Sequence, residues 1–475
     1  MNAHVRSPGD TSRNDLTATA RIADFIRSVV VDEETRRRCV SVIVDTLAVT
    51  LAGSGEPGVR ALEATLDPAA AMGVPSLWSG HAYRRDDAAL LIGMASHILD
   101  YDDVSMLAVC HPTAPVLTAA LCAVPWTDLS GPDLVDAVAV GTEVMIRTGQ
   151  AMGFRHYDIG FHATATIGTV GAAAAAARLM RLDQHQTVQA LAIAASLASG
   201  LRKNFGSMVK SLHVGLAASN GVKAAQWARA GITGAAEPLE VEGFLRAFSG
   251  GAADHWPDDL ALGRPFVLAE PGFEQKRYPC CYMLHRMIEG TLMLVRDTGV
   301  SLDDVAKAEI SMPKGGTKPL IHPIPKTGLN ALFSGPYAVA ASLRDGRINL
   351  KSFTDQAVAR SDVQARLPDI TLIERDGQPA QGSDLGNAPV GVRLTLRDGA
   401  VLSRTVTQSP GSFDDPLTPE QLLAKWVDCL ERANPAISAD AAASLFEQGL
   451  GLATMPSTGA WLAGLAGAAG RPAVD

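Results

Sequence analysis

Apolar residues recur every three or four positions over most of the first 260 residues, with polar residues between them. This spacing is typical of helices that bury one face. It predicts helices over 18–30, 33–53 and 86–103. The alanine-rich stretch 168–180 and the segment 189–200 have the small apolar residues of central helices. The first half of the chain is therefore expected to be helical.

The pattern changes near Phe266, where proline and glycine become frequent. Residues 306–313 alternate between apolar and polar, as a half-buried strand does. Two alternating runs within 391–406 flank Arg397-Asp398-Gly399, which predicts a hairpin. Helical spacing returns over 418–433.

These patterns predict a mainly α protein with a second, α+β domain. The large helical domain is expected to combine residues 1–268 and 411–475, so that both chain ends build it. Residues 269–410 are expected to form an inserted α+β lid. Residues 1–16 are polar without an apolar core, so we expect a disordered leader and no signal peptide.

Composition narrows the possible functions. Apolar residues make up 47% of the 475 and charged residues 19%, so the chain can bury large cores. The net charge of −9 argues against nucleic-acid binding, which needs a basic surface. No apolar run is long enough to predict a membrane span, and six irregularly spaced cysteines predict no disulfide framework. We expect a cytoplasmic protein.

Two histidines stand at predicted helix starts. Asp100 closes one helix, and His111 precedes Pro112 at the start of the next. His162 precedes the alanine-rich helix. Free N–H groups at helix starts favour carboxylates and disfavour an imidazolium, so both histidines could act as neutral bases or donors. Each is also typical of a capping or packed side chain. The acidic motif Asp100-Tyr101-Asp102-Asp103 could also suggest a terpene cyclase. Such enzymes need a pocket lined by aromatic residues, and an aromatic content of 5% argues against one.

Further candidates lie on either side of the predicted domain boundary. Lys210 and His213 share a helical face among small and apolar residues, where a lysine is costly unless it meets an anion. A solvated lysine at a helix end is the alternative. Ser207 and Lys210 match the Ser-x-x-Lys pattern of serine acylases, but the companion motifs of those enzymes are missing from the sequence. Tyr337 opens a predicted helix and could donate to a carboxylate, or simply pack.

Lys276, Cys280, Cys281 and His285 bring a cation, two thiols and an imidazole within ten residues. Adjacent thiols rarely complete a zinc site with one histidine, so no metal is expected. Buried inert thiols are the default interpretation. Nucleotide-binding loops and His-Glu-x-x-His are absent from the sequence, so no cofactor is expected.

Five stretches taken in order resemble the MmgE/PrpD family, which includes 2-methylcitrate dehydratase, cis-aconitate decarboxylase and iminodisuccinate epimerase. The stretches are 97–121, 161–179, 204–234, 276–281 and 333–346. The resemblance implies a helical domain with an α+β lid, a homodimer, no cofactor and a small polycarboxylate substrate.

The resemblance also implies a site made from residues of both domains. The residues that the resemblance assigns to this site are Asp100, His111, His162, Lys210, Lys276 and Tyr337. We further expect Cys281 or His285 to be the catalytic partner on the lid side, and Lys276 and His213 to bind substrate. The family decarboxylase carries Thr and His where this chain has Val104 and Cys281.

The implied activity is that of a lyase, by dehydration or decarboxylation. An epimerase of a related dicarboxylate and a non-catalytic helical binding protein are the alternatives.

Overall fold

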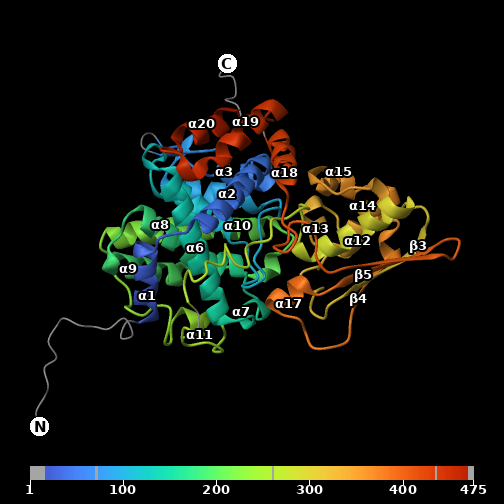
Figure 1. The fold of residues 1–475 in the computed structure, drawn as a ribbon, viewed down its shortest axis with the longest axis horizontal. Coiled ribbons are helices and arrows are strands. Elements are labelled where there is room, and N and C mark those ends of the chain that lie inside the picture. The colour runs from blue at the N-terminus through green and yellow to red at the C-terminus, as the bar shows by residue number, and fades with distance from the viewer. Residues whose placement is uncertain (1–16, 70–72, 259–260, 434–435, 469–475) are drawn as a thin grey trace, which may run out of the picture.

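The computed structural model describes residues 17–69, 73–258, 261–433 and 436–468. The predicted disorder of residues 1–16 lies outside them. Helices dominate the first half of the chain (Figure 1). They are α1 (Ala18–Ser28), α2 (Glu33–Gly53), α3 (Pro57–Glu63), α4 (Arg85–His97), α5 (Thr113–Ala123), α6 (Gly131–Met152), α7 (Arg155–Asp158), α8 (Ala163–Leu179), α9 (Gln184–Leu197), α10 (Met208–Arg229) and α11 (Phe244–Phe248). A short hairpin joins β1 (Val74–Pro75) to β2 (Ala82–Tyr83).

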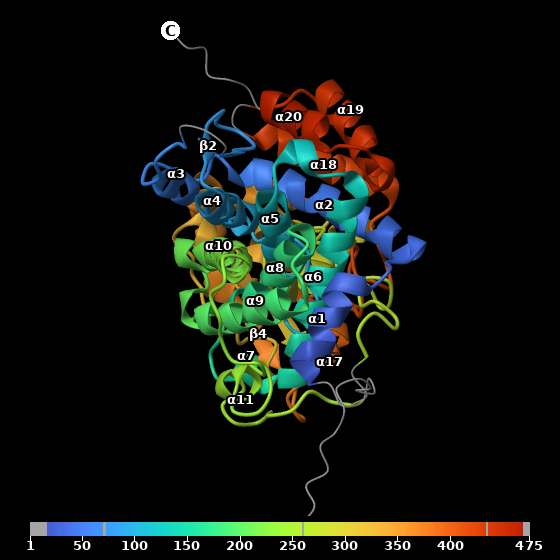
Figure 2. The same cartoon turned by 90° about the vertical axis from the view of Figure 1, so that its left-hand side faces the viewer.

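The two ends of the chain share one helical layer. The C-terminal helices are α18 (Pro419–Arg432), α19 (Ala439–Leu450) and α20 (Gly459–Ala468). Helices α18 and α19 pack against α2, so the red and blue ends of the ribbon lie together (Figure 2). One continuous hydrophobic cluster runs from Ile22 through Val138 to Leu465. Both chain ends therefore contribute to a single helical core.

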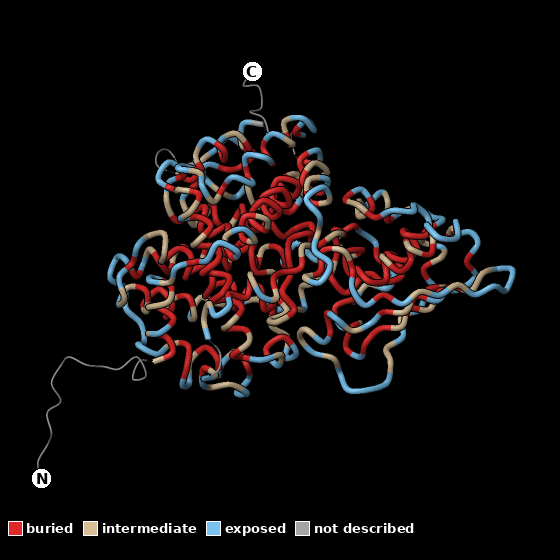
Figure 3. The backbone as a smooth tube through the Cα atoms, viewed as in Figure 1, coloured by how far each residue is buried: buried red, intermediate tan, exposed pale blue. Residues whose placement is uncertain are grey.

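Small residues let the central helices approach closely, which explains the low aromatic content. A methyl group on Gly215 of α10 would lie 2.2 Å from the carbonyl oxygen of Leu90 on α4. One on Gly221 of α10 would lie 2.4 Å from Ala172 on α8. These contacts fix α10 against both neighbours and thereby fix the side chains at their ends. Figure 3 shows that the backbone in the interior of the helical part is largely buried.

The α+β part holds a four-stranded sheet in the order β4-β3-β5-β6. The strands are β3 (Val305–Met312), β4 (Ile370–Glu374), β5 (Val390–Leu396) and β6 (Val401–Val406). Strand β3 runs parallel to β4 and antiparallel to β5, and β5–β6 is the predicted hairpin. The helices of this part are α12 (Tyr282–Thr298), α13 (Gly328–Ala331), α14 (Gly335–Asp345), α15 (Asp355–Val358), α16 (Ser361–Gln364) and α17 (Gly382–Asn387).

A second hydrophobic cluster forms where α12 and α14 pack on this sheet. It contains residues between 278 and 394 together with Val104 and Met106, which come from the loop between α4 and α5. That loop therefore lies between the two clusters. The mainly α fold with an α+β part is confirmed. Within the described residues no single helix is long and apolar enough to cross a membrane. Among the same residues, α2 and α3 taken together are long and apolar enough, but the chain bends by 82° between them.

Candidate active site

A cavity lies between the helical layer and the α+β part. It holds about 640 Å³ of space between atoms, part of which is open to solvent. Its polar lining includes Asp100, His111, His162, Lys210 and Lys276. Six of the nine residues predicted to form the site therefore meet at one cavity, since Cys281 also lines it. They are separated by up to 181 positions in the sequence.

Asp100 stands at the centre of these residues. One of its carboxylate oxygens accepts from Lys210 Nζ at 3.0 Å and from Lys276 Nζ at 2.9 Å. Burial alone would raise the pKa of Asp100, but the two ammonium groups hold it well below its ordinary value. The backbone of Asp100 has φ +48°, in the left-handed region that most residues avoid. Lys276 Nζ also donates to the Asp100 carbonyl at 2.7 Å and helps to hold this conformation.

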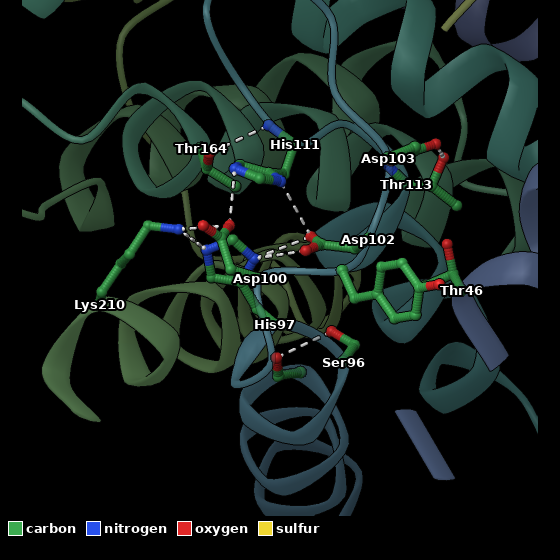
Figure 4. Close-up of polar contacts among 12 residues, drawn as sticks. Thr46, Ser96, His97, Asp100, Asp102, Asp103, His111, Thr113, Thr164 and Lys210 are labelled. Carbon is green, nitrogen blue, oxygen red and sulfur yellow. Dashed lines mark hydrogen bonds and ion pairs between the residues drawn. The ribbon is translucent and has the colours of Figure 1, made fainter. Parts of the chain in front are cut away.

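His97 is the last residue of α4 and was not among the predicted site residues. Its ring connects Lys210 to the carboxylate of Asp102 (Figure 4). Its Nε2 lies 2.8 Å from Lys210 Nζ. An ammonium can only donate, so Nε2 accepts and Nδ1 carries the proton. Nδ1 donates to Asp102 at 2.8 Å. Burial lowers the pKa of His97 to about 3, so the ring is neutral.

His111 has contacts on both ring nitrogens. Nδ1 lies 3.3 Å from Asp102, and Nε2 lies 3.5 Å from Asp100 (Figure 4). Its backbone N–H donates to Thr164 Oγ1. Burial lowers its pKa despite the nearby Asp102. This shift favours the neutral form of the imidazole. The start of α5 does not bind a ligand carboxylate as expected. There, Asp103 accepts from the backbone N–H of Thr113 at 3.2 Å and from its hydroxyl, so that helix start holds a protein carboxylate.

His162 leaves one nitrogen facing the cavity. Its Nδ1 lies 3.2 Å from Nδ1 of His213. Its Nε2 is buried and has no hydrogen-bond partner among the described residues. Burial and the nearby Lys210 hold its pKa well below the ordinary value. His213 does not line the cavity. It lies behind His162, so its expected role in binding substrate is replaced by contact with another imidazole.

Of the two predicted lid-side partners, the structure brings only Cys281 to the cavity. Cys281 immediately precedes α12, and burial raises its pKa to about 11, which keeps the thiol protonated at neutral pH. His285 lies one turn further along α12, fully buried against the rings of Tyr278 and Tyr282. It does not line the cavity because its side chain points into the packed core of the α+β part.

Tyr337 does not reach the cavity. It lies in the first turn of α14, and its hydroxyl donates to the carbonyl of Ser352. Its ring packs against Phe353, and no part of the side chain is exposed. The expectation that Tyr337 delivers a proton to substrate is therefore corrected. The sequence placed a tyrosine at a helix start, but it could not show which side of α14 the phenol occupies.

A third lysine holds the loop that carries Asp100. Lys425 of α18 donates from Nζ to the Tyr101 carbonyl at 2.9 Å and pairs with Asp45 of α2 at 2.7 Å. Both charged side chains are buried. The carbonyls of residues 100 and 101 are thus held by Lys276 and Lys425, which come from distant parts of the chain. The C-terminal helices therefore help to position the candidate site.

We expect Lys425→Met to lower the free energy of unfolding by about 3–5 kcal/mol, because it leaves Asp45 buried and unpaired. The double variant Lys425→Met/Asp45→Asn should recover most of that loss, since it removes the uncompensated charge. Urea denaturation followed by circular dichroism measures both. A single variant as stable as the parent protein would show that this ion pair contributes nothing to stability.

Four of these residues also satisfy the distance requirement for a metal site. Ligand atoms of His97, Asp100, Asp102 and His111 lie within 4.8 Å of one another. However, the Asp100 oxygen already accepts from two ammonium groups, and His97 uses Nε2 for Lys210 and Nδ1 for Asp102. A divalent cation would have to displace or repel both lysines. The donor set therefore suits ammonium groups better than a metal.

Comparison with known proteins agrees with this arrangement. The family model described as the MmgE/PrpD N-terminal domain matches residues 20–256, and the MmgE/PrpD C-terminal domain matches residues 278–447. The chain belongs to the MmgE/PrpD family. The membership inferred from the five sequence stretches is thereby confirmed.

Several curated MmgE/PrpD relatives share much of the chain. Cis-aconitate decarboxylase of Mus musculus is 28% identical over 408 residues, which is 82% of this chain and 81% of the mouse protein. The Homo sapiens enzyme of the same name is 30% identical over 353 residues, 71% of each chain. Cis-aconitate decarboxylase of Aspergillus terreus (strain NIH 2624 / FGSC A1156) is 25% identical over 441 residues, 86% of this chain and 88% of the fungal protein.

The cavity of this MmgE/PrpD protein draws on both matched regions. Asp100, His111, His162 and Lys210 lie in the first, and Cys281 lies in the second. Lys276 falls in the short segment between them. The site therefore forms only when the two family domains pack together.

Proposed function

We propose that this protein is a lyase that decarboxylates a small unsaturated polycarboxylic acid of the cis-aconitate class. The observation that carries the proposal is the buried group of Asp100, Lys210 and Lys276 beside two neutral histidines. The names of the relatives favour decarboxylation over the other lyase reaction. None of the relatives described above is named as an epimerase, so that alternative has no support from them.

The two lysines suit the charge that this reaction develops. Breaking the carbon–carboxylate bond releases CO₂ and leaves an electron pair delocalised toward the remaining carboxylates. Fixed ammonium groups in a water-poor cavity stabilise such charge most strongly where it develops in the transition state. Lys210 and Lys276 both face the cavity and are held in place by Asp100. They are the groups that would bind substrate carboxylates.

His162 is best placed to supply the proton that replaces CO₂. Each ring nitrogen of His111 lies within 3.5 Å of a carboxylate oxygen, whereas His162 lines the cavity and its Nε2 has no hydrogen-bond partner among the described residues. If His213 donates across the Nδ1–Nδ1 contact, His162 carries its proton on Nε2. As Nε2 delivers this proton to carbon, Nδ1 takes the proton of His213, so that His162 stays neutral, and His213 regains a proton from solvent. His213 then acts as a positioning residue that sets this tautomer.

Proton NMR in D₂O tests the reaction directly. With cis-aconitate as substrate we expect loss of CO₂ and one deuterium in the product for each turnover. Loss or addition of water without CO₂ would instead establish a dehydratase. Deuterium exchange with the carbon skeleton intact would contradict a lyase, and no reaction or exchange with any polycarboxylate would favour a binding protein. The predicted homodimer and cytoplasmic location remain proposals, and light scattering tests the first.

A further inference from the structure

The cavity has two chemically different walls. The polar wall holds Asp100, His111, His162, Lys210 and Lys276. The other, here called the apolar wall, consists of Val104, Met106, Val109, Phe205, Met283 and Phe333. All six belong to the second hydrophobic cluster or pack against it. The apolar residues are therefore one continuous surface rather than scattered side chains.

The charges available to a substrate are few. The cationic lining residues are Lys210, Lys276 and Lys318. Lys318 already pairs with Asp158, and its side chain is 43% exposed. Lys210 and Lys276 share Asp100, so two ammonium groups face the ligand with one carboxylate already between them. Each ammonium has three donors and uses two of them within the protein, so each keeps one N–H for a substrate carboxylate.

A third carboxylate on the side of the cavity away from the lysines and histidines would meet the apolar wall. Burying an ionised group against carbon without a partner is strongly unfavourable, whereas burying a hydrocarbon there is favourable. Lys210 does not extend to the far side of this wall, because its Nζ lies 5.2 Å above the Phe205 ring and 5.3 Å above the Phe333 ring while bound to Asp100. The two rings thus mark the border between the polar and apolar walls.

We propose that the natural substrate carries an apolar arm beside its carboxylates, and that Val104, Met106, Val109, Met283 and the two phenylalanines bind that arm. This inference rests on the proposed function for the identity of the polar end. It assigns the substrate to the class of alkyl-bearing unsaturated acids, in which two carboxylates are anchored by lysines and a hydrocarbon fills the rest of the cavity.

A series of 2-alkylmaleates tests the inference by binding alone. These acids carry two cis carboxylates and a chain of chosen length: maleate, 2-methylmaleate, 2-propylmaleate and 2-pentylmaleate. Isothermal titration calorimetry with the intact protein should show Kd falling about fourfold per added methylene until the wall is covered. A Kd that does not fall with chain length, or cis-aconitate binding more tightly than 2-propylmaleate, would overturn the inference.

Two variants locate the binding. Val104→Thr changes one methyl to a hydroxyl at nearly constant shape and should reduce the gain in affinity that propyl and pentyl chains give relative to maleate. Lys203→Ala, an exposed lysine outside the cavity, should leave the whole series unchanged. An unaltered series in Val104→Thr would count against the apolar wall as the binding surface.

The binding series and the decarboxylation assay can fail independently of each other. Turnover of cis-aconitate with no gain from alkyl chains would keep the decarboxylase and reject the apolar arm. Tightening with chain length but no CO₂ from any acid would keep the apolar arm and reject the decarboxylase.

Discussion

Replacing Lys210 with methionine is expected to lower kcat/KM for decarboxylation by about 10²–10³-fold, the usual effect of removing one group that stabilises developing charge. Methionine keeps the length and can pack against Phe205 and Phe333, so the fold should remain intact. The loss should come from the missing ammonium, which contacts Asp100 and His97. Steady-state CO₂ release measures the effect.

Lys203→Met provides the matched control because Lys203 is exposed and lies outside the cavity. Its kinetics should equal those of the parent protein. Thermal melts of both variants establish whether they fold. A folded Lys210→Met variant with full turnover would show that Lys210 does not anchor the substrate.

Replacing His162 with glutamine is expected to lower kcat by about 10²–10⁴-fold, because a proton donor at the cavity is lost. The glutamine amide can keep a hydrogen bond to His213 but cannot exchange a proton with carbon near neutral pH. Substrate affinity should change little, since Lys210 and Lys276 remain. The split between kcat and the dissociation constant distinguishes a chemical role from a packing role.

His81→Gln serves as the control for this experiment, because His81 is exposed and lies outside the cavity. It should retain the parent kcat. If His162→Gln retained full turnover and placed one deuterium in the product, the proton would have to come from another residue, and His111 would be the next candidate.

The helical pattern and the hairpin were predictable because each depends on residues close in sequence. The helix predicted over 33–53 forms over that range, and the hairpin turns at Gly399 with φ +89°. Asp100, His111, His162, Lys210 and Lys276 were selected from motifs, and the structure brings them together. Residues that act through a neighbour were harder to find, because sequence does not show which side chains face one another.

His97 illustrates this limit. It lies in the same stretch, 97–121, as Asp100. The helix was expected to run to residue 103, whereas α4 ends at His97. With the helix ending there, its imidazole turns toward Lys210. Tyr337 shows the opposite error, because its helix start was correctly placed but its phenol faces Ser352. The rotation of a helix about its axis depends on tertiary packing, which local patterns do not contain.

The protonated thiol of Cys281 bears on how the enzyme tolerates its own chemistry. Loss of CO₂ from an unsaturated acid gives another unsaturated acid, and such alkenes alkylate thiolates. A pKa of about 11 leaves only about one thiol in 10⁴ ionised at pH 7. In the proposed decarboxylation, the thiol of Cys281 would therefore react only slowly with an electrophilic product in the cavity.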